Sequence, residues 1–166
     1  MLIQYLENDH KRIDEYLHRA AAHPDETEMT AYSQFRGGLL RHIGIGENLL
    51  FPTLLQTLEG QPLPDITQIK LDHAALVALL VPPPTRSIIA ALRAILDKHN
   101  MLEERAGGIY QFFKRIPGVT MDVLLQNVRS SPAVPMLPQK STPNILNATR
   151  RALARAGYNL ADYEND

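Results

Sequence analysis

The stretch ILDKHNMLEERAGGIY, residues 95–110, puts a histidine and a glutamate on the apolar side of a predicted helix. Apolar residues recur around His99 at spacings of three and four, which is the period of an amphipathic helix. Glu103 follows His99 by four residues, about 40° further round the helix, so both side chains face the same core. Because a carboxylate buried among leucines is costly without a partner, the stretch predicts a polar site inside a helical core.

Three similar segments each place one more histidine on an apolar helical stripe. They are LENDHKRIDEYL (6–17) with His10, LLRHIGIGENLLFP (39–52) with His42, and KLDHAALVALL (70–80) with His73. The periodicity predicts helices over about 2–22, 30–58, 65–81 and 88–114, separated by proline- and glycine-containing breaks. Asp65 with Gln68 resembles a capping box for the third helix, and Thr85 or Ser87 can cap the fourth. The expected fold is an all-α, up-down-up-down four-helix bundle.

The spacing of the four histidines brings them to one level of such a bundle. In an antiparallel helix pair, residues equidistant from the turn lie at the same height. The midpoints between successive histidines are positions 26, 57.5 and 86, and all three fall at or beside predicted breaks. We therefore expect His10, His42, His73 and His99 to meet in the core.

A single core histidine is more often satisfied by a hydrogen bond than by a metal. Four at one level present eight ring nitrogens, and each one left without a partner costs about 1–3 kcal/mol. A metal centre removes this cost by taking a lone pair from each ring, and Glu103 can bridge a cation. Glu47 and Glu104 lie five residues after His42 and His99, so they reach inward only from a locally altered turn.

Three other polar residues are expected outside the ligand set. Asp14 lies four residues after His10 and is expected to be a partner of that ring rather than a ligand. His18 and His23 lie off the stripe and at the helix end, so both are expected in solvent.

Composition narrows the classes of function. The chain of 166 residues is 45% hydrophobic and 21% charged, which is typical of a globular domain. It has no cysteine, which excludes thiolate metal sites, disulfides and a cysteine nucleophile. Lys+Arg of 17 against Asp+Glu of 18 gives a formal charge of -1, so there is no general attraction to nucleic acid or anionic membrane. No apolar run reaches the ~18 residues of a membrane span, and the first residues lack a signal-peptide pattern. We expect a cytoplasmic protein, and oligomerisation stays open.

The sequence after Pro117 has a different character. We expect residues 1–117 to form the bundle and 118–166 a C-terminal extension. Prolines make 130–143 an extended linker, and Thr142-Pro143 then begins a short basic helix that Gly157 ends. Its arginines, Arg150, Arg151 and Arg155, could face a partner, but a surface strap packed by its apolar residues is the favoured interpretation.

The four ordered histidine segments resemble the hemerythrin-like HHE cation-binding family over about residues 1–114. The resemblance implies a four-helix bundle with a non-heme, usually di-iron, centre held by histidines and bridging carboxylates. It makes His10, His42, His73, His99 and Glu103 metal ligands, with Glu47 as the remaining carboxylate of the second helix.

Two positions depart from the family pattern. The second helix of the family usually reads His-x-x-x-Glu-Glu, whereas here the first of those glutamates is Gly46. The oxygen-carrying members have a second histidine in the third helix, where this chain has Val77. The second helix is also rich in glycine, so it could unwind locally and turn Glu47 inward. A mononuclear centre is therefore considered beside a di-iron one, and manganese or zinc also suits nitrogen and oxygen ligands.

Three functions are compatible with this pattern. The leading hypothesis is a non-heme iron protein that binds or senses dioxygen, nitric oxide, peroxide or iron itself. The second is a di-iron oxidase or peroxidase-like enzyme, although such enzymes usually have more glutamates. The third is an interaction module with a degenerate metal site.

Overall fold

The computed structural model describes residues 1–164, and every regular element among them is helical. The histidines lie on α1 (Leu2–Ala20), α2 (Met29–Ile45), α4 (Ile66–Leu79) and α5 (Arg86–Glu104). A π-helix, η1 (Gly46–Leu50), continues α2 into α3 (Phe51–Thr57). The predicted all-α class is confirmed. None of the described helices has the length and apolar character needed to cross a membrane.

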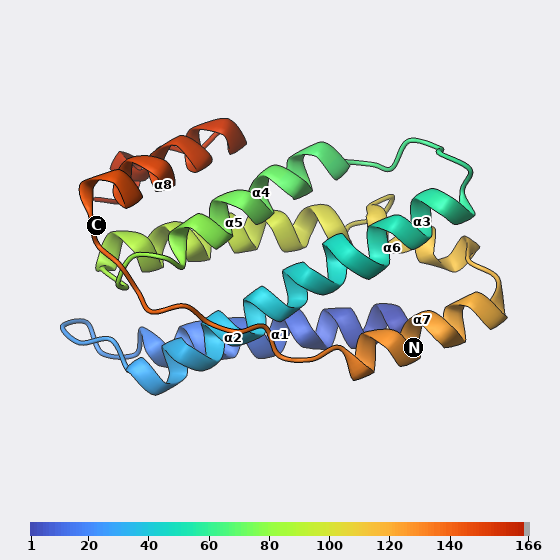
Figure 1. Ribbon diagram of the computed structural model, residues 1–166, viewed down its shortest axis with the longest axis horizontal. Coiled ribbons are helices and arrows are strands. Elements are labelled where there is room, and N and C mark those ends of the chain that lie inside the picture. The colour runs from blue at the N-terminus through green and yellow to red at the C-terminus, as the bar shows by residue number, and fades with distance from the viewer. Residues whose placement is uncertain (165–166) are drawn as a thin grey trace.

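The helices pack as two neighbouring pairs. α1 lies against α2, α4 lies against α5, and α1 also contacts α5. Figure 1 shows the two pairs stacked side by side along the long axis of the molecule, with α8 (Pro143–Ala156) over α4. The pairing places the middle of each long helix opposite the middle of the others.

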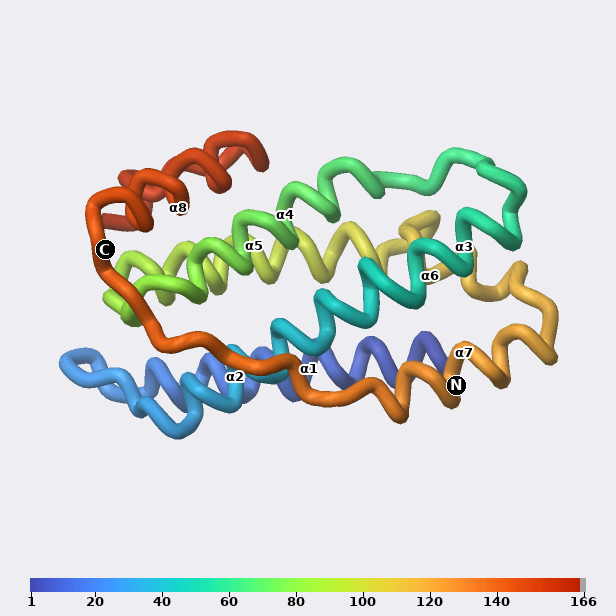
Figure 2. The backbone as a smooth tube through the Cα atoms, in the orientation of Figure 1, coloured from blue at the N-terminus to red at the C-terminus, as the bar shows by residue number. Residues whose placement is uncertain are grey.

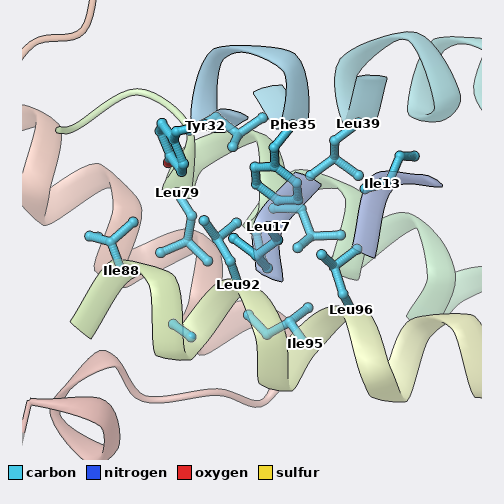
Figure 3. Close-up of a cluster of buried hydrophobic side chains, with 14 of the residues drawn as sticks. Ile13, Leu17, Tyr32, Phe35, Leu39, Leu79, Ile88, Leu92, Ile95 and Leu96 are labelled. Carbon is cyan, nitrogen blue, oxygen red and sulfur yellow. The ribbon is translucent and has the colours of Figure 1, made fainter. Parts of the chain in front are cut away.

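Two apolar clusters fill the interior, and the histidine segments lie between them. One cluster contains Ile13 of α1 and Leu76 of α4 and extends to α8 (Figure 3). The other contains Leu6 of α1 and Ile69 of α4 and extends to the later helices. Since His10 lies between Leu6 and Ile13 along α1, the histidines form a buried polar layer between two apolar clusters.

The fourth long helix ends earlier than the periodicity predicts. The expected helix reaches Lys114, but α5 ends at Glu104, and α6 (Ile109–Phe112) and η2 (Phe113–Arg115) follow a tight turn. Gly107 in this turn has a φ of +78°, which favours glycine. Gly108 has no room for a side chain, because a Cβ there would lie 2.6 Å from the Leu102 carbonyl oxygen. The turn sends the chain back toward the histidine layer.

The predicted helix caps are partly confirmed. The Thr85 hydroxyl accepts a bond from the Ile88 amide and caps α5, and Thr142 caps α8 in the same way. The capping box at Asp65 is wrong, because Asp65 is left-handed at φ +56° and its carboxylate pairs with Arg105. Gln68, the other half of the predicted box, instead donates to Asp72 and to the Ala156 carbonyl oxygen.

The glycines of α2 accommodate close neighbours. A Cβ at Gly37 would lie 3.7 Å from the Met136 sulfur, and one at Gly44 would lie 3.9 Å from Val134. A Cβ at Gly38 would lie 3.5 Å from Ile13 of α1. These glycines therefore bring α2 close to α1 and to the segment 131–142, while the predicted local change of the helix occurs further on, at η1.

Residues after 117 share both apolar clusters. A helix not foreseen from the sequence, α7 (Gly118–Ser130), buries Leu124, Leu125 and Val128 in one of them. The proline-rich segment 131–142 then runs back along α2, as the trace in Figure 2 shows, and Arg41 donates to the Ser131 carbonyl oxygen. α8 begins at Pro143 as predicted, buries Leu153 and leaves its arginines exposed, and a short 3-10 helix, η3 (Leu160–Tyr163), follows it.

The Gly108 turn can be tested by substitution. Gly108→Ala should lower the free energy of unfolding by about 1–3 kcal/mol, because the added methyl group overlaps backbone carbonyl oxygens. Chemical denaturation measures the change. Gly118→Ala, where a Cβ meets nothing within 4 Å, is the control and should leave stability unchanged or higher. Equal stability of the Gly108 variant and the parent would contradict this account of the turn.

Candidate metal centre

The four predicted histidines are buried together in the core. The rings of His10 and His42 lie 4.5 Å apart between centroids, and those of His73 and His99 lie 4.8 Å apart. All four side chains are at most 5% exposed. The first pair joins α1 to α2 and the second joins α4 to α5, as the midpoint argument predicts.

Glu103 connects the two histidine pairs. Its Oε2 atom lies 3.1 Å from His10 Nε2, 3.9 Å from His42 Nε2 and 3.5 Å from His99 Nε2. Two groups of ligand atoms are close enough to surround a cation, namely His10 with His42 and Glu103, and His73 with His99 and Glu103. The same buried carboxylate belongs to both groups.

A carboxylate also approaches the Nδ1 atom of each histidine. Glu104 lies 2.5 Å from His10 Nδ1, and Glu47 lies 2.7 Å from His73 Nδ1. Asp9 lies 2.9 Å from His42 Nδ1. Asp72 lies 3.8 Å from His99 Nδ1, which is beyond hydrogen-bonding distance. When Nδ1–H donates to a carboxylate, the neutral ring keeps its lone pair on Nε2, which is the usual outer arrangement of a metal-binding histidine.

The layer has two halves, the His10–His42 pair and the His73–His99 pair, and the same pattern of carboxylates occurs around both. In each half an aspartate directly precedes the first histidine and faces the Nδ1 atom of the second, as Asp9 does for His42. The glutamate five residues after the second histidine of each pair bonds the first histidine of the other pair. Glu47, which follows His42, bonds His73, and Glu104, which follows His99, bonds His10. Sequence reasoning missed both aspartates, although the dipeptide Asp-His occurs twice at corresponding places.

The Nε2 atoms on the inner side of the layer either face each other or have no hydrogen-bond partner among the described residues. His10 Nε2 and His42 Nε2 lie only 2.9 Å apart, so two lone pairs would face each other unless a proton or a cation lies there. The Nε2 atoms of His73 and His99 are buried with no hydrogen-bond partner among the described residues. Nitrogen and oxygen donors arranged in this way fit a divalent or trivalent transition metal.

The charges of the layer respond to burial and to one another. Burial alone would raise the pKa of Glu103, but the adjacent histidines, His99 first, hold it well below its usual range. Burial lowers the pKa of His10, but hydrogen bonds that its ring donates to Glu103 and Glu104 outweigh this effect and raise the pKa to about 9. Burial and the neighbouring His99 lower the pKa of His73 to about 4. Without a metal, a proton on His10 therefore partly balances the Glu103 charge.

Tyr110 is a member of the site that sequence reasoning missed. Its hydroxyl donates to Glu103 Oε2 at 2.9 Å and lies 3.1 Å from His10 Nε2. Burial and the Glu103 charge raise the pKa of Tyr110 well above its ordinary value, so the phenol is protonated in the metal-free protein. The signal in the sequence was Gly107-Gly108, which ends α5 and returns the chain to the layer.

Glu47 lies in the π-helix η1. In η1 the Phe51 amide bonds the Gly46 carbonyl oxygen, an i to i+5 bond that adds a residue to the turn. Glu104 makes the corresponding bond to His10 as the last residue of the regular helix α5, so that contact does not need the altered turn expected from the sequence. Glu47 lies five residues after His42. Its side chain is 31% exposed and contacts the outer nitrogen of His73, and it belongs to neither of the two candidate ligand groups.

The remaining predicted residues lie at the edge of the site or outside it. Asp14, expected as the partner of His10, is exposed, and Glu104 takes that role. His18 and His23 are exposed, as expected. A Cβ at Gly46 would lie 3.4 Å from the His73 ring and 3.6 Å from the Phe51 ring, so these two rings occupy the space beside this glycine.

Searches of the chain against protein-family models, curated proteins and solved structures gave no significant match.

The charge balance predicts how the metal-free protein responds to pH. The pKa of His10 is about 9 in the folded protein against an ordinary value of 6.5, so its stabilising contribution is complete below pH 6.5 and is lost as pH rises through about 9. With a chelator present, we expect the free energy of unfolding to fall by on the order of 3 kcal/mol over this range. Urea denaturation measures it. His10→Gln should lose this dependence and His18→Gln should keep it, whereas an unchanged decline in the His10 variant would refute the assignment.

The outer carboxylates predict a graded effect on metal affinity. Asp9→Asn weakens the bond that orients His42, so we expect metal affinity to fall by about 10- to 100-fold. Glu15→Gln, an exposed carboxylate on the same helix that does not border the cavity beside the histidines, should leave affinity unchanged. Competition with a metal indicator measures both variants, and equal affinities would show that Asp9 does not orient a ligand.

Proposed function

We propose that this protein holds a non-heme iron centre in the histidine layer and uses it to bind or sense a small ligand such as dioxygen, nitric oxide or peroxide. The observation that carries the proposal is the sharing of one buried carboxylate, Glu103, by two pairs of buried histidines. A layer of this kind between two apolar clusters is costly without a cation and is satisfied with one.

The packing of the helices supports a hemerythrin-like, up-down-up-down four-helix bundle as the scaffold. α1 with α2 and α4 with α5 form the two pairs, and each helix contributes one histidine. The extension from residue 118 to 164 covers this bundle through α7 and α8. This scaffold is the one that the resemblance to the HHE family implies.

The ligand set favours iron held by His10, His42, His73, His99 and Glu103. Two donor groups that share Glu103 suit two ions bridged by that carboxylate, while a single ion in one group is the mononuclear form. Glu47 supports His73 from its outer nitrogen. When bound, iron with imidazole and carboxylate ligands supplies reversible ligand binding and electron transfer.

The surroundings of the layer favour a very small ligand. A cavity of about 10 Å³ borders His10, His42 and His99, with Asp14 and Asn100 also in its wall. A space of this size admits about one water molecule. Small apolar or diatomic molecules fit this space better than an organic substrate does, and the scarcity of inward carboxylates favours binding over oxidase chemistry.

Metal analysis of matched variants tests the proposal. We expect the purified protein, reconstituted anaerobically with Fe(II), to contain one or two iron ions per chain by elemental analysis. Glu103→Gln should lose most of the iron because both ligand groups lose their shared oxygen. Glu15→Gln, on the exposed side of α1, is the control and should keep it. Glu47→Ala should retain iron with reduced affinity.

The outcomes separate the proposal from its alternatives. A protein that contains no iron and takes up none would refute the proposal. Preferential uptake of manganese or zinc would show that the centre holds that metal and not iron. Absorption bands that appear with oxygen and bleach on reduction indicate reversible binding. Catalytic consumption of peroxide that is lost in His99→Ala would instead indicate a peroxidase-like enzyme.

A further inference from the structure

Each half of the histidine layer has an aromatic ring stacked on its first histidine, but the two aromatic residues differ. Tyr110 stacks on His10 at 5.7 Å between centroids with an interplanar angle of 17°, and Phe51 stacks on His73 at 5.9 Å with an angle of 13°. The aromatic position is thus repeated, but only one half has a hydroxyl. Along the chain, the segment after His99 supplies both Glu103 and Tyr110, whereas the segment after His42 has Gly46 and Phe51 at the corresponding places.

The phenol oxygen of Tyr110 lies among the candidate ligand atoms of its half. It is 2.9 Å from Glu103 Oε2 and 3.1 Å from His10 Nε2, and His10 Nε2 is itself 2.9 Å from His42 Nε2. Donor atoms bound at about 2.0–2.2 Å from one ion are separated by roughly 3–3.5 Å. The oxygen is therefore placed as a fourth donor around the same point, and Tyr110 is only 1% exposed.

We propose that Tyr110 is a metal ligand of the His10, His42 and Glu103 position, which makes the two halves of the centre unequal. On binding, the phenol O–H bond is replaced by an oxygen–metal bond and the proton leaves to solvent, with no change of oxidation state. The His73 position has no such donor, because Phe51 occupies the corresponding place. This inference rests on the proposed iron centre and adds a ligand to it.

Visible absorption of the ferric protein tests the proposal. A phenolate bound to Fe(III) gives a charge-transfer band in the visible region, and the phenolate ring vibrations that this band enhances separate it from the bands of bound oxygen. We expect the band in the parent protein after anaerobic Fe(II) loading and oxidation in air. Tyr110→Phe should lose it while retaining at least half of the iron. Tyr32→Phe is the matched control, because Tyr32 is equally buried but lies in the other apolar cluster.

A second measurement needs no variant. Resonance Raman spectra excited in the visible band should show vibrations of a phenolate ring in the parent protein. Iron-loaded parent protein without the band or these vibrations would overturn the Tyr110 assignment and leave the iron centre standing, as would a band that persists in Tyr110→Phe. Absence of iron from the parent protein would overturn the proposed function itself, so the two failures are distinct.

Discussion

Burial of the Glu103 carboxylate among four imidazoles is the constraint on which the arrangement of this molecule depends. Burying an unpaired carboxylate in an apolar interior costs several kcal/mol of folding free energy, and such a group usually becomes protonated instead. Here the surrounding histidines keep Glu103 ionised, and without a metal His10 retains a proton. The four helices must therefore meet at one height and on the correct faces, since a displaced histidine would leave this charge without a partner.

Carboxylates on the outer side of the layer hold the histidine rings in place. Asp9, Glu47 and Glu104 bond the Nδ1 atoms of three histidines and so fix which nitrogen faces inward. The pattern occurs once in each helix pair, which gives the layer an approximate two-fold organisation. The two halves are unequal because the chain after His99 supplies Glu103 and Tyr110, whereas the corresponding places after His42 hold Gly46 and Phe51.

Much of this arrangement could be predicted because histidine spacing and helical period act over long, regular segments. The common level of the histidines, the inward direction of Glu103 and the Thr85 and Thr142 caps follow from such local rules. The roles of Asp9 and Tyr110 could not be predicted in the same way, because each depends on how a residue meets a different helix. The end of α5 at Glu104 was missed because the apolar period continues past it, whereas Gly107 and Gly108 allow the chain to turn sharply there.

On the proposed function, a metal ion lies between the histidine pairs and Glu103. Anomalous diffraction at the iron absorption edge, from crystals of the reconstituted protein, locates such an ion. We expect an anomalous peak within bonding distance of Glu103 and of the Nε2 atoms of at least one histidine pair. Iron-loaded crystals with no peak in this layer, or with iron only on surface carboxylates, would contradict it.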